Sequence, residues 1–286
     1  IIAIGWMTNL IQRGLASLKR INALLDARPM VESPRQDSTT PGPDHSKPDT
    51  RKHFQRIIFD RVDFGYDPDK PLLSDITLDI PFGSVTGISG PPGSGKTTLV
   101  QLIPRIFDTT RGTLRLDDTA VTAMELDTLR EMVAFMPQEP FLFSGTIREN
   151  ILMGRSFSSD RLDHILSVCQ LSETIRQMPD GLDTLIGEKG ITLSGGQKQR
   201  ITLARTLIQD KPVTILDDPI SQVDTQTASA IIQSLQQHGS GRIMIIISHR
   251  MSALSFCDRI LVLEEGRITH QGDHDALMTG SRFCRT

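Results

Sequence analysis

The sequence of 286 residues has few cysteines, few aromatic residues (5%) and no excess of positive charge. Its three cysteines, Cys169, Cys257 and Cys284, are odd in number and lack metal-ligand spacing, which excludes a disulfide framework and favours reduced packing thiols. A net charge of −3 lacks the basic excess of proteins that bind nucleic acid, so no nucleic-acid partner is expected. A hydrophobic content of 38% over this length is enough to bury a core, which excludes a wholly disordered chain.

Long apolar runs are also missing, because none reaches the roughly 18 residues that cross a bilayer. The chain starts without Met or a cleavable signal pattern and is expected to be a piece of a longer protein. Residues 1–30 show apolar side chains at helical intervals, with Arg13, Lys19 and Arg20 among them. This pattern fits either an amphipathic packing helix or the end of a membrane-spanning helix that continues into the cytoplasm.

Residues 31–52 are rich in Pro, Ser, Thr and Asp and are expected to form a linker, so a folded domain is predicted over residues 53–286. Within it, short apolar runs alternate with helical patterns, which predicts an α/β fold whose core strands are parallel. The predicted strands are 57–64, 85–89, 133–136, 213–217, 243–248 and 260–263, and the predicted helices are 97–107, 160–169, 195–209 and 225–238.

Residues 90–97 read Gly-Pro-Pro-Gly-Ser-Gly-Lys-Thr and fit the pattern G-x-x-x-x-G-K-[ST] between a predicted strand and a predicted helix. Glycines let the backbone wrap closely around phosphate with its N–H groups inward, and the helix N-terminus adds positive potential. Lys96 is expected to neutralise β- and γ-phosphate charge, and Thr97 to offer its hydroxyl to Mg²⁺. A chance glycine-rich turn is the weaker alternative. The predicted nucleotide-binding residues here are Gly90, Gly93, Ser94, Gly95, Lys96, Thr97 and Thr98.

A second run, Val213 to Asp217, is a buried strand pattern that ends in two carboxylates, Asp217 and Asp218. In P-loop enzymes an acid at this strand end reaches Mg²⁺, and a neighbouring acid orients or polarises the attacking water. We therefore predict Asp217 as a metal ligand and Asp218 as a catalytic residue. The alternative is two solvated aspartates that begin a turn before Pro219.

Leu193-Ser194-Gly195-Gly196-Gln197, followed by Lys198-Gln199-Arg200, resembles the signature of the ATP-binding cassette (ABC) family. Ser194 and Gln197 also match the S-x-x-[EQ] capping box that starts a helix. The two interpretations are compatible, because a capped helix start with two glycines presents N–H groups and a dipole to an anion.

The resemblance to ABC proteins extends over nearly all of residues 54–280 and implies further roles. Tyr66, the only tyrosine, matches the aromatic that stacks on adenine, although alone it reads as a strand-end aromatic. Gln138 resembles the loop glutamine that touches Mg²⁺ and senses the membrane domain. His249 resembles the switch histidine at the γ-phosphate, although a lone histidine there is more often structural. Residues 187–190 and 221–224 resemble an exporter loop and the loop that crosses the dimer interface.

The resemblance implies a P-loop NTPase with a RecA-like core, an antiparallel β subdomain and an α-helical signature subdomain at roughly 140–210. It also implies that two cassettes close head to tail, so that each chain holds two half-sites for ATP and Mg²⁺. One nucleotide would be served by Lys96, Thr97, Gln138, Asp217, Asp218 and His249, and the other by Ser194, Gly195, Gly196 and Gln197 of the same chain.

In ABC exporters the cassette lies at the cytoplasmic face of the inner (cell) membrane, joined to a membrane domain that is missing from this sequence. The loop from Gln138 through Phe141 and Phe143 is expected to pass motion to that domain, unless the two phenylalanines are core residues. The partner implied is a second half-transporter, and the resemblance is to bacterial multidrug-type half-transporters of the heterodimeric group.

Two departures from the family pattern support a heterodimer. Exporters usually have Glu after the metal-binding Asp, whereas Asp218 here is one C–C bond, roughly 1.5 Å, shorter. A misplacement of about 1 Å costs on the order of 10²-fold in rate, so slow hydrolysis with retained binding is expected. Residues 221–224, Ser-Gln-Val-Asp, replace the usual Ser-Ala-Leu-Asp. The alternatives are a nucleotide-gated dimerisation module with negligible turnover and a soluble cassette that acts on DNA or in translation.

Overall fold

The computed structural model describes residues 2–26, 29, 31–34, 55–67, 69–187, 192–239 and 241–280. The chain divides into two compact units, Ile1–Glu32 and Ser33–Thr286. Most of the predicted linker, residues 35–52, lies outside the described residues.

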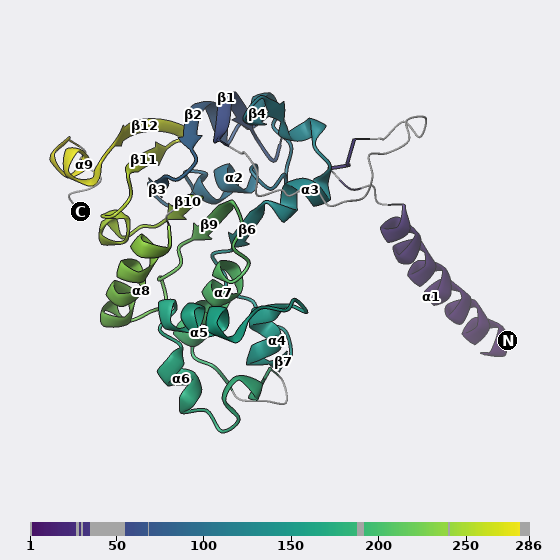
Figure 1. Cartoon of the computed structure of the whole chain (residues 1–286). Helices are drawn as coiled ribbons and strands as arrows, with labels where there is room; N and C mark the ends of the chain where they lie inside the picture. Colours follow the sequence, from purple (N-terminus) through teal and green to yellow (C-terminus); the bar gives the residue numbers. More distant parts are fainter. Residues whose placement is uncertain are drawn as a thin grey trace, which may run out of the picture. The chain divides into compact units, whose positions relative to one another are not determined.

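The first unit is built on one helix, α1 (Ile2–Leu25), drawn in purple in Figure 1. The helix predicted from apolar periodicity in this region is confirmed. Among the residues that the structure describes, no helix is both long enough and apolar enough to cross a membrane. The exposed large apolar side chains of α1 are Ile4, Trp6, Met7, Leu10, Ile11, Leu15, Leu18, Ile21 and Leu25.

The second unit is organised around a six-stranded sheet with the strand order β12-β11-β3-β10-β9-β6. All residues of β3, β9 and β10 are buried, as expected for apolar strands of a parallel sheet that is covered on both faces. The predicted α/β class with parallel core strands is confirmed. The strands are β3 (Val85–Ser89), β6 (Val133–Met136), β9 (Val213–Asp217), β10 (Ile243–Ile247), β11 (Arg259–Glu264) and β12 (Arg267–Gly272).

The prediction missed β12, which pairs antiparallel with β11 at the edge of the sheet. Glu265 and Gly266 connect the two strands, and both have positive φ (47° and 74°), as a two-residue hairpin turn requires. The residues of this edge strand are largely exposed, and no apolar run marks it in the sequence.

A second, antiparallel sheet of four strands has the order β2-β1-β4-β5. Only β1 of this sheet was predicted. In β2 buried and exposed residues alternate, as in a sheet with one solvated face. The four strands are β1 (Arg56–Phe64), β2 (Leu73–Pro81), β4 (Arg111–Leu116) and β5 (Thr119–Ala120).

Helix α2 (Lys96–Gln101) is shorter than the predicted 97–107, and the chain continues through turns. Pro104 explains the early end, because it offers no N–H for the helical ladder and disfavours helical geometry in the residue before it. The buried side chains Leu99, Leu102 and Ile103 pack against the antiparallel sheet in one apolar cluster. The helix that follows β3 is thereby fixed between the two sheets.

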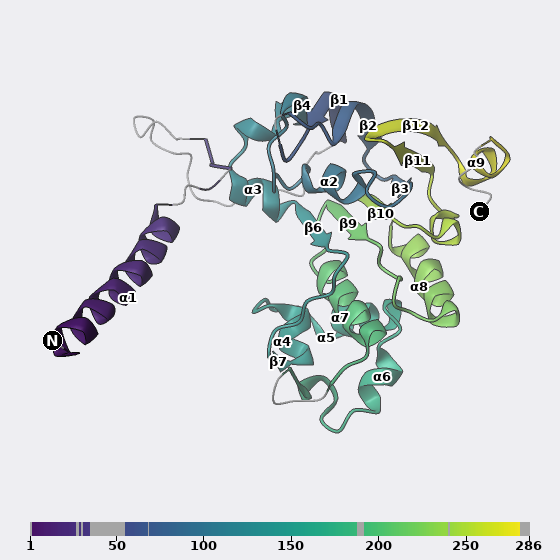
Figure 2. The ribbon, with the colours of Figure 1, turned by 180° about the vertical axis from the view of Figure 1, so that it is seen from behind.

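The remaining helices lie around the parallel sheet, and Figure 2 shows α4, α5 and α6 gathered around α7, away from the antiparallel sheet. Helices α4 to α7 fall within the range 140–210 expected for a helical subdomain, and the predicted helices 160–169, 195–209 and 225–238 are present with ends shifted by at most two residues. The elements are α3 (Leu126–Glu131), α4 (Ile147–Leu152), α5 (Ser159–Val168), α6 (Ser172–Arg176), α7 (Gly195–Leu207), α8 (Thr225–His238), α9 (His274–Gly280), η1 (Val121–Ala123), η2 (Gly181–Asp183), η3 (Met251–Leu254), β7 (Gly145–Thr146) and β8 (Leu185–Ile186).

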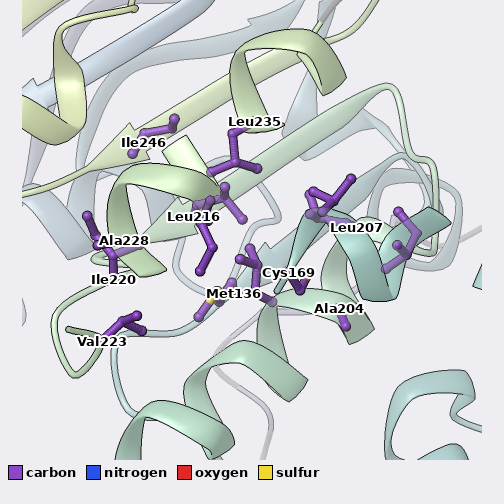
Figure 3. Packing of buried hydrophobic residues seen from close by; sticks show 14 of the residues in the cluster. Met136, Cys169, Ala204, Leu207, Leu216, Ile220, Val223, Ala228, Leu235 and Ile246 are labelled. Carbon is purple, nitrogen blue, oxygen red and sulfur yellow. The ribbon is translucent and has the colours of Figure 1, made fainter. Parts of the chain in front are cut away.

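One apolar cluster joins α7 and α8 to the parallel sheet (Figure 3). Ala204 and Leu207 of α7 lie in this cluster with Leu216 of β9 and Leu235 of α8. Helix α7 is therefore attached through close packing to the strand that ends in Asp217.

Two of the three cysteines lie in the described part of the chain, and both are buried free thiols. Burial raises the pKa of Cys257 to about 12 and raises the pKa of Cys169 as well, so both thiols stay protonated at neutral pH. The predicted packing role is confirmed for these two, and Cys284 lies outside the described residues.

Replacing Leu216 with alanine is expected to lower the free energy of unfolding by about 2–5 kcal/mol, because removing this fully buried side chain leaves a cavity between α7 and the sheet. Urea denaturation followed by circular dichroism measures the change. Leu185→Ala is the matched control, since Leu185 is 58% exposed and should change stability by less than about 0.5 kcal/mol. Equal effects of the two substitutions would contradict the packing described here.

Candidate functional site

Four neighbouring parallel strands, β3, β10, β9 and β6, end at the same edge of the central sheet. The glycine-rich loop follows β3, His249 follows β10, Asp217 ends β9, and Gln138 follows β6. In open α/β sheets ligands bind at the carboxyl ends of the strands. The strand order thus brings four segments that are distant in sequence to one edge.

The loop 90–95 between β3 and α2 is held by close contacts with its neighbours. A Cβ on Gly90 would lie 2.1 Å from the Leu263 carbonyl oxygen, and a Cβ on Gly95 would lie 2.7 Å from Leu73 Cδ2. Gly95 also has φ 97°, where a side chain is strained. The sequence attributes these glycines to close approach of phosphate, and the structure adds a second reason, which is packing against β11 and β2.

The ammonium group of Lys96 lies inside this loop. Its Nζ donates hydrogen bonds to the carbonyl oxygens of Gly90 (2.9 Å) and Pro91 (2.8 Å), and lies 3.4 Å from Ser94 Oγ. The residue is only 6% exposed, and burial lowers the pKa of Lys96 while the carboxylates of Asp217 and Asp218 oppose that shift. The loop therefore surrounds a desolvated positive charge whose present partners are neutral carbonyl groups.

Thr97 and Asp217 connect the loop helix to the acid-bearing strand. Thr97 Oγ1 donates a hydrogen bond of 2.6 Å to Asp217 Oδ2. Asp217 is 1% exposed, and burial raises its pKa, with the Thr97 bond lowering it and the charge of Asp218 raising it further. A buried carboxylate with a raised pKa is destabilised in its charged form and would gain from a cation.

A hydroxyl and a carboxylate in contact form an oxygen donor pair that fits Mg²⁺. Mg²⁺ is typically bound through one or two carboxylates together with substrate phosphates and water, rather than by a cage of protein ligands. The described residues contain no group of three or more His, Cys, Asp or Glu that could hold a metal ion.

Asp218 has a left-handed backbone (φ 50°) and is 8% exposed. Its Oδ1 accepts a hydrogen bond of 3.4 Å from Ser248 Oγ, and its N–H donates to the Ile247 carbonyl (2.9 Å). Burial raises the pKa of Asp218, and the neighbouring His249 is the main opposing influence. The two aspartates are buried rather than solvated, so the alternative of a solvated turn is wrong.

Tyr66 lies beside the start of α2. Its hydroxyl is 3.0 Å from Thr98 Oγ1, and its ring meets those of Phe64 and Phe107 edge-on, with centroids 5.1 and 5.2 Å away. The tyrosine is nevertheless 60% exposed. An aromatic ring that is held by its hydroxyl and by two neighbouring rings, and is still largely exposed, is suited to stacking on a base.

Gln138 and His249 have exposed side chains, and in the described part of the chain neither takes part in a hydrogen bond. His249 influences the pKa of both aspartates through its charge. The structure places the two side chains at the expected edge of the sheet without joining them to the acids.

The segment 194–197 forms the start of α7, and it is called the signature tip below. Ser194 Oγ accepts from the Gln197 N–H (3.3 Å), and Gln197 Oε1 accepts from the Ser194 N–H (2.9 Å), so the predicted capping box is present. A Cβ on Gly195 would lie 2.3 Å from Gln222 Oε1. Within the described residues no hydrogen bond joins the signature tip to residues 90–98. The tip lies instead against the turn that follows β9.

Sequence reasoning gave no role to Ser248 or Gln199, and it noted Gln222 only as part of the loop 221–224. Gln199 is completely buried and lies in the run Lys198-Gln199-Arg200, which the motif quotes without giving it a role. Ser248 follows the apolar run of β10 and bears the hydroxyl that meets Asp218. A single buried polar residue carries no signal in the sequence, because its partners are defined by the fold.

The loop after Gln138 is exposed at its tip. Phe141 and Phe143 are 60% and 50% exposed and pack edge-on against each other, so the alternative that they are core residues is wrong. Arg205 of α7 donates to the Phe141 carbonyl (2.8 Å), and Asn150 of α4 bonds both main-chain groups of Phe143. Of the predicted exporter loop, residues 188–190 lie outside the described residues.

Comparisons with known proteins agree with these motifs. Residues 73–221 match the family model described as ABC transporter. The chain is 38% identical over 285 residues (99% of this chain, 46% of the relative) to the Escherichia coli multidrug resistance-like ATP-binding protein MdlA. It is 35% identical over 276 residues (96% and 46%) to the ATP-dependent lipid A-core flippase of Desulfotalea psychrophila.

A solved structure of a bacterial Atm1-family ABC exporter with ATP bound is also similar, with a TM-score of 0.81 and 32% identity over 96% of this chain and 47% of that one. The chain thus spans about half the length of the relatives that it matches.

Replacing Asp217 with asparagine is expected to stabilise the nucleotide-free chain at neutral pH. Because the folded pKa of Asp217 is raised, its contribution to stability is full below its ordinary pKa of 3.8 and is lost as pH rises through the raised value. The variant avoids that loss. Its melting temperature should exceed that of the unmodified chain at pH 7 by about 2–4 °C for each kcal/mol gained, and the difference should shrink toward about pH 4.

Differential scanning fluorimetry between these pH values measures the effect. Asp163→Asn, at an exposed position of α5, is the matched control and should leave the melting temperature unchanged. A less stable Asp217→Asn chain at pH 7 would contradict the account of this buried carboxylate.

Proposed function

We propose that this chain, which belongs to the ABC transporter family, binds ATP with Mg²⁺ at the sheet edge and hydrolyses it to power export of a substrate through a membrane domain. The observation that carries the proposal is the 2.6 Å bond between Thr97 and Asp217, formed beside the buried ammonium of Lys96. This bond joins the glycine-rich loop helix to a buried carboxylate, and together they offer the oxygen ligands and the positive charge that a magnesium-bound phosphate requires.

The residues of the site divide the work of nucleotide binding. The loop N–H groups and Lys96 would hold the β- and γ-phosphates, and the exposed ring of Tyr66 would stack on adenine. Thr97, Asp217 and Gln138 would hold Mg²⁺, which when bound withdraws charge from the phosphates. Lys96 would exchange its carbonyl partners for phosphate oxygens, which are stronger acceptors for an ammonium group.

Asp218 and His249 are proposed for the hydrolytic step. The raised pKa of Asp218 makes its carboxylate a better acceptor for the proton of an attacking water. Ser248 fixes one of its oxygens and leaves the other for that water. The exposed side chain of His249, next along this edge, is free to reach the γ-phosphate.

A partner cassette completes each site in our proposal. The signature tip is the capped N-terminus of a 13-residue helix and contains two glycines, which makes it a suitable anion site. Since it lies against residues 218–222 rather than against its own phosphate loop, we infer that it serves the nucleotide of a second half-transporter. The solved relative described as an ABC exporter with ATP bound supports ATP as the nucleotide.

We further propose that the partner differs from this chain. Asp218 shortens the carboxylate reach, so its own site hydrolyses slowly, whereas its signature tip is intact and completes a competent site. Phe141 and Phe143 form an exposed apolar pair suited to meeting the membrane domain. Residues 1–30 are the end of its last spanning helix, residues 31–52 are the linker, and the cassette works at the cytoplasmic face of the cell membrane.

A second candidate is a nucleotide-gated dimerisation module with negligible turnover, which the short carboxylate of Asp218 favours. The relatives are named for multidrug resistance and for lipid A-core flipping, and these names do not support a cassette that acts on DNA or in translation. For the substrate we infer an amphiphilic compound, since these relatives are named for multidrug resistance and for flipping a lipid.

Titration with a fluorescent ATP analogue and Mg²⁺ should show saturable binding that Lys96→Ala weakens at least tenfold. Loss of charge-assisted hydrogen bonds to phosphate accounts for about 1.5–3 kcal/mol, and each 1.4 kcal/mol is tenfold in Kd. Lys19→Ala on α1 is the control and should leave Kd unchanged. Absence of saturable binding to the natively folded chain would refute the proposed function.

Asp218→Glu should raise kcat by about 10–100-fold with little change in ATP affinity, because the longer side chain restores the missing reach. Steady-state ATPase assays of the chain alone and mixed with a candidate partner measure this, with Asp163→Glu as the control. A homodimer of the unmodified chain with full activity that Asp218→Glu leaves unchanged would remove the proposal of a weak site. Negligible turnover of both chains, with ATP-dependent dimers, would support the second candidate.

A further inference from the structure

Gln199 is a completely buried glutamine in the fifth position of α7. Its Nε2 donates to the Asp218 carbonyl (2.9 Å) and to Ser221 Oγ (2.8 Å), and its Oε1 accepts from the Gln222 N–H (2.8 Å). Both ends of the amide are thus satisfied, which offsets the cost of burying it. All three partners lie in one short segment, residues 218–222, called the acid turn below.

The acid turn is joined directly to the nucleotide site. It begins at Asp218, whose left-handed backbone follows Asp217 without an intervening residue, and Asp217 is bonded to Thr97 of the phosphate loop helix. A displacement of the Asp217 main chain would be passed through one peptide bond to Asp218, whose carbonyl is bonded to Gln199. A continuous chain of bonds therefore runs from Thr97 to α7.

The same turn also touches the signature tip. The Gln222 side-chain oxygen would lie 2.3 Å from a Cβ on Gly195, and its carbonyl oxygen 2.9 Å from a Cβ on Gly196. Gln222 therefore lies directly over the first turn of α7. It contacts the helix at Gly195 and again at Gln199, one turn further along. The acid turn holds α7 at two places, and one of them is the tip.

Apolar packing alone would not fix this arrangement as strictly. Ile220 and Val223 belong to the same buried cluster as Leu216 and Ala204 (Figure 3). Apolar contacts of this kind are not directional, whereas the three hydrogen bonds of Gln199 define one position of the turn relative to the helix. A helix that had only to pack here would need no buried amide.

We propose that Gln199 is a positioning residue that transmits nucleotide occupancy of the chain's own phosphate loop to its signature tip. The proposal rests on the proposed function, in which the tip serves the partner's nucleotide. Gln199 then couples the two nucleotide sites of the cassette pair without touching either nucleotide. Two elements that respond to one another through such a bonded connection share a coupling free energy that can be measured from either end.

The test is hydrogen exchange of residues 194–200, measured by mass spectrometry with and without saturating Mg²⁺ and non-hydrolysable ATP. The 286-residue chain is kept at a concentration where mass photometry shows monomers, so that no partner nucleotide reaches the tip. In the unmodified chain nucleotide should change exchange at the tip by at least about fivefold. Gln199→Met keeps the volume without polar atoms and therefore cannot bond to the acid turn, and Gln199→Glu keeps the shape but, when ionised, has no donor for the Asp218 carbonyl.

Both variants are expected to bind nucleotide with nearly unchanged Kd while the response of residues 194–200 is lost. A residue that only stabilised the fold would not separate these two readouts. Gln233→Glu, on the exposed face of α8, is the matched control and should keep the full response. If neither Gln199 variant folds, Ser221→Ala replaces them, since it removes the hydroxyl to which Gln199 Nε2 is bonded.

A full response in the folded Gln199 variants overturns the inference. It is equally overturned if the unmodified chain binds nucleotide without any response at the tip, or if Ser221→Ala, used as the substitute, responds fully. Failure of the unmodified chain to bind nucleotide at all contradicts the proposed function instead, so the two failures are distinguishable.

Discussion

The hydrogen bond between Thr97 and Asp217 lies where two buried carboxylates and one buried ammonium meet at the edge of the central sheet. Two negative groups and one positive group leave an excess of negative charge in a poorly solvated place. Burial raises the pKa of Asp217 and of Asp218 and lowers the pKa of Lys96, which shows that each group is destabilised when charged. The remaining structure has to hold these groups in position despite that cost, and a divalent cation with phosphates would relieve it.

The surrounding fold supplies this support from both sides of the sheet. Strands β3, β9 and β10 are buried along their whole length, so the acids extend from a rigid element. On one side α2 is packed under the antiparallel sheet, and on the other α7 is packed against Leu216. Arg205 of α7 also holds the loop with Phe141, so one helix contacts the acid turn at one end and the exposed apolar loop at the other.

Both departures from the family pattern fall within a few residues of each other, in the segment after β9. Asp218 shortens the acid, and Gln222 replaces a usual alanine with a side chain that lies over Gly195. Gln199 bonds to both of these residues. The features that distinguish this chain are thus concentrated in the acid turn, which follows Asp217 and contacts the signature tip.

The sequence alone determined the order of the motifs and most of the core elements. Strands 133–136 and 213–217 and helix 225–238 were predicted with their observed ends, because buried parallel strands are short apolar runs and the helix carries an N-cap at Asp224. The capping box at Ser194 was equally readable, since its two partners are three residues apart. Helix α2 was predicted too long because the apolar pattern was followed past Pro104.

Tertiary structure decided what depends on residues distant in the chain. The strands β2, β4 and β12 were missed. In β2 the alternation of apolar and polar residues from Ile76 to Ile80 was readable from the sequence, whereas β4 and β12 are largely exposed and have few apolar residues to mark them. Gly90 and Gly95 are required because β11 and β2 pack closely against them, and not only because a ligand would approach. Phe141 and Phe143 are exposed, although phenylalanine is usually a core residue. The partners of Gln199 lie 19 to 23 residues away, and a buried amide acquires its meaning only from the groups that folding brings to it. Sequence patterns indicate hydrogen bonds between nearby residues and periodic burial, whereas contacts between distant residues form only when the chain folds.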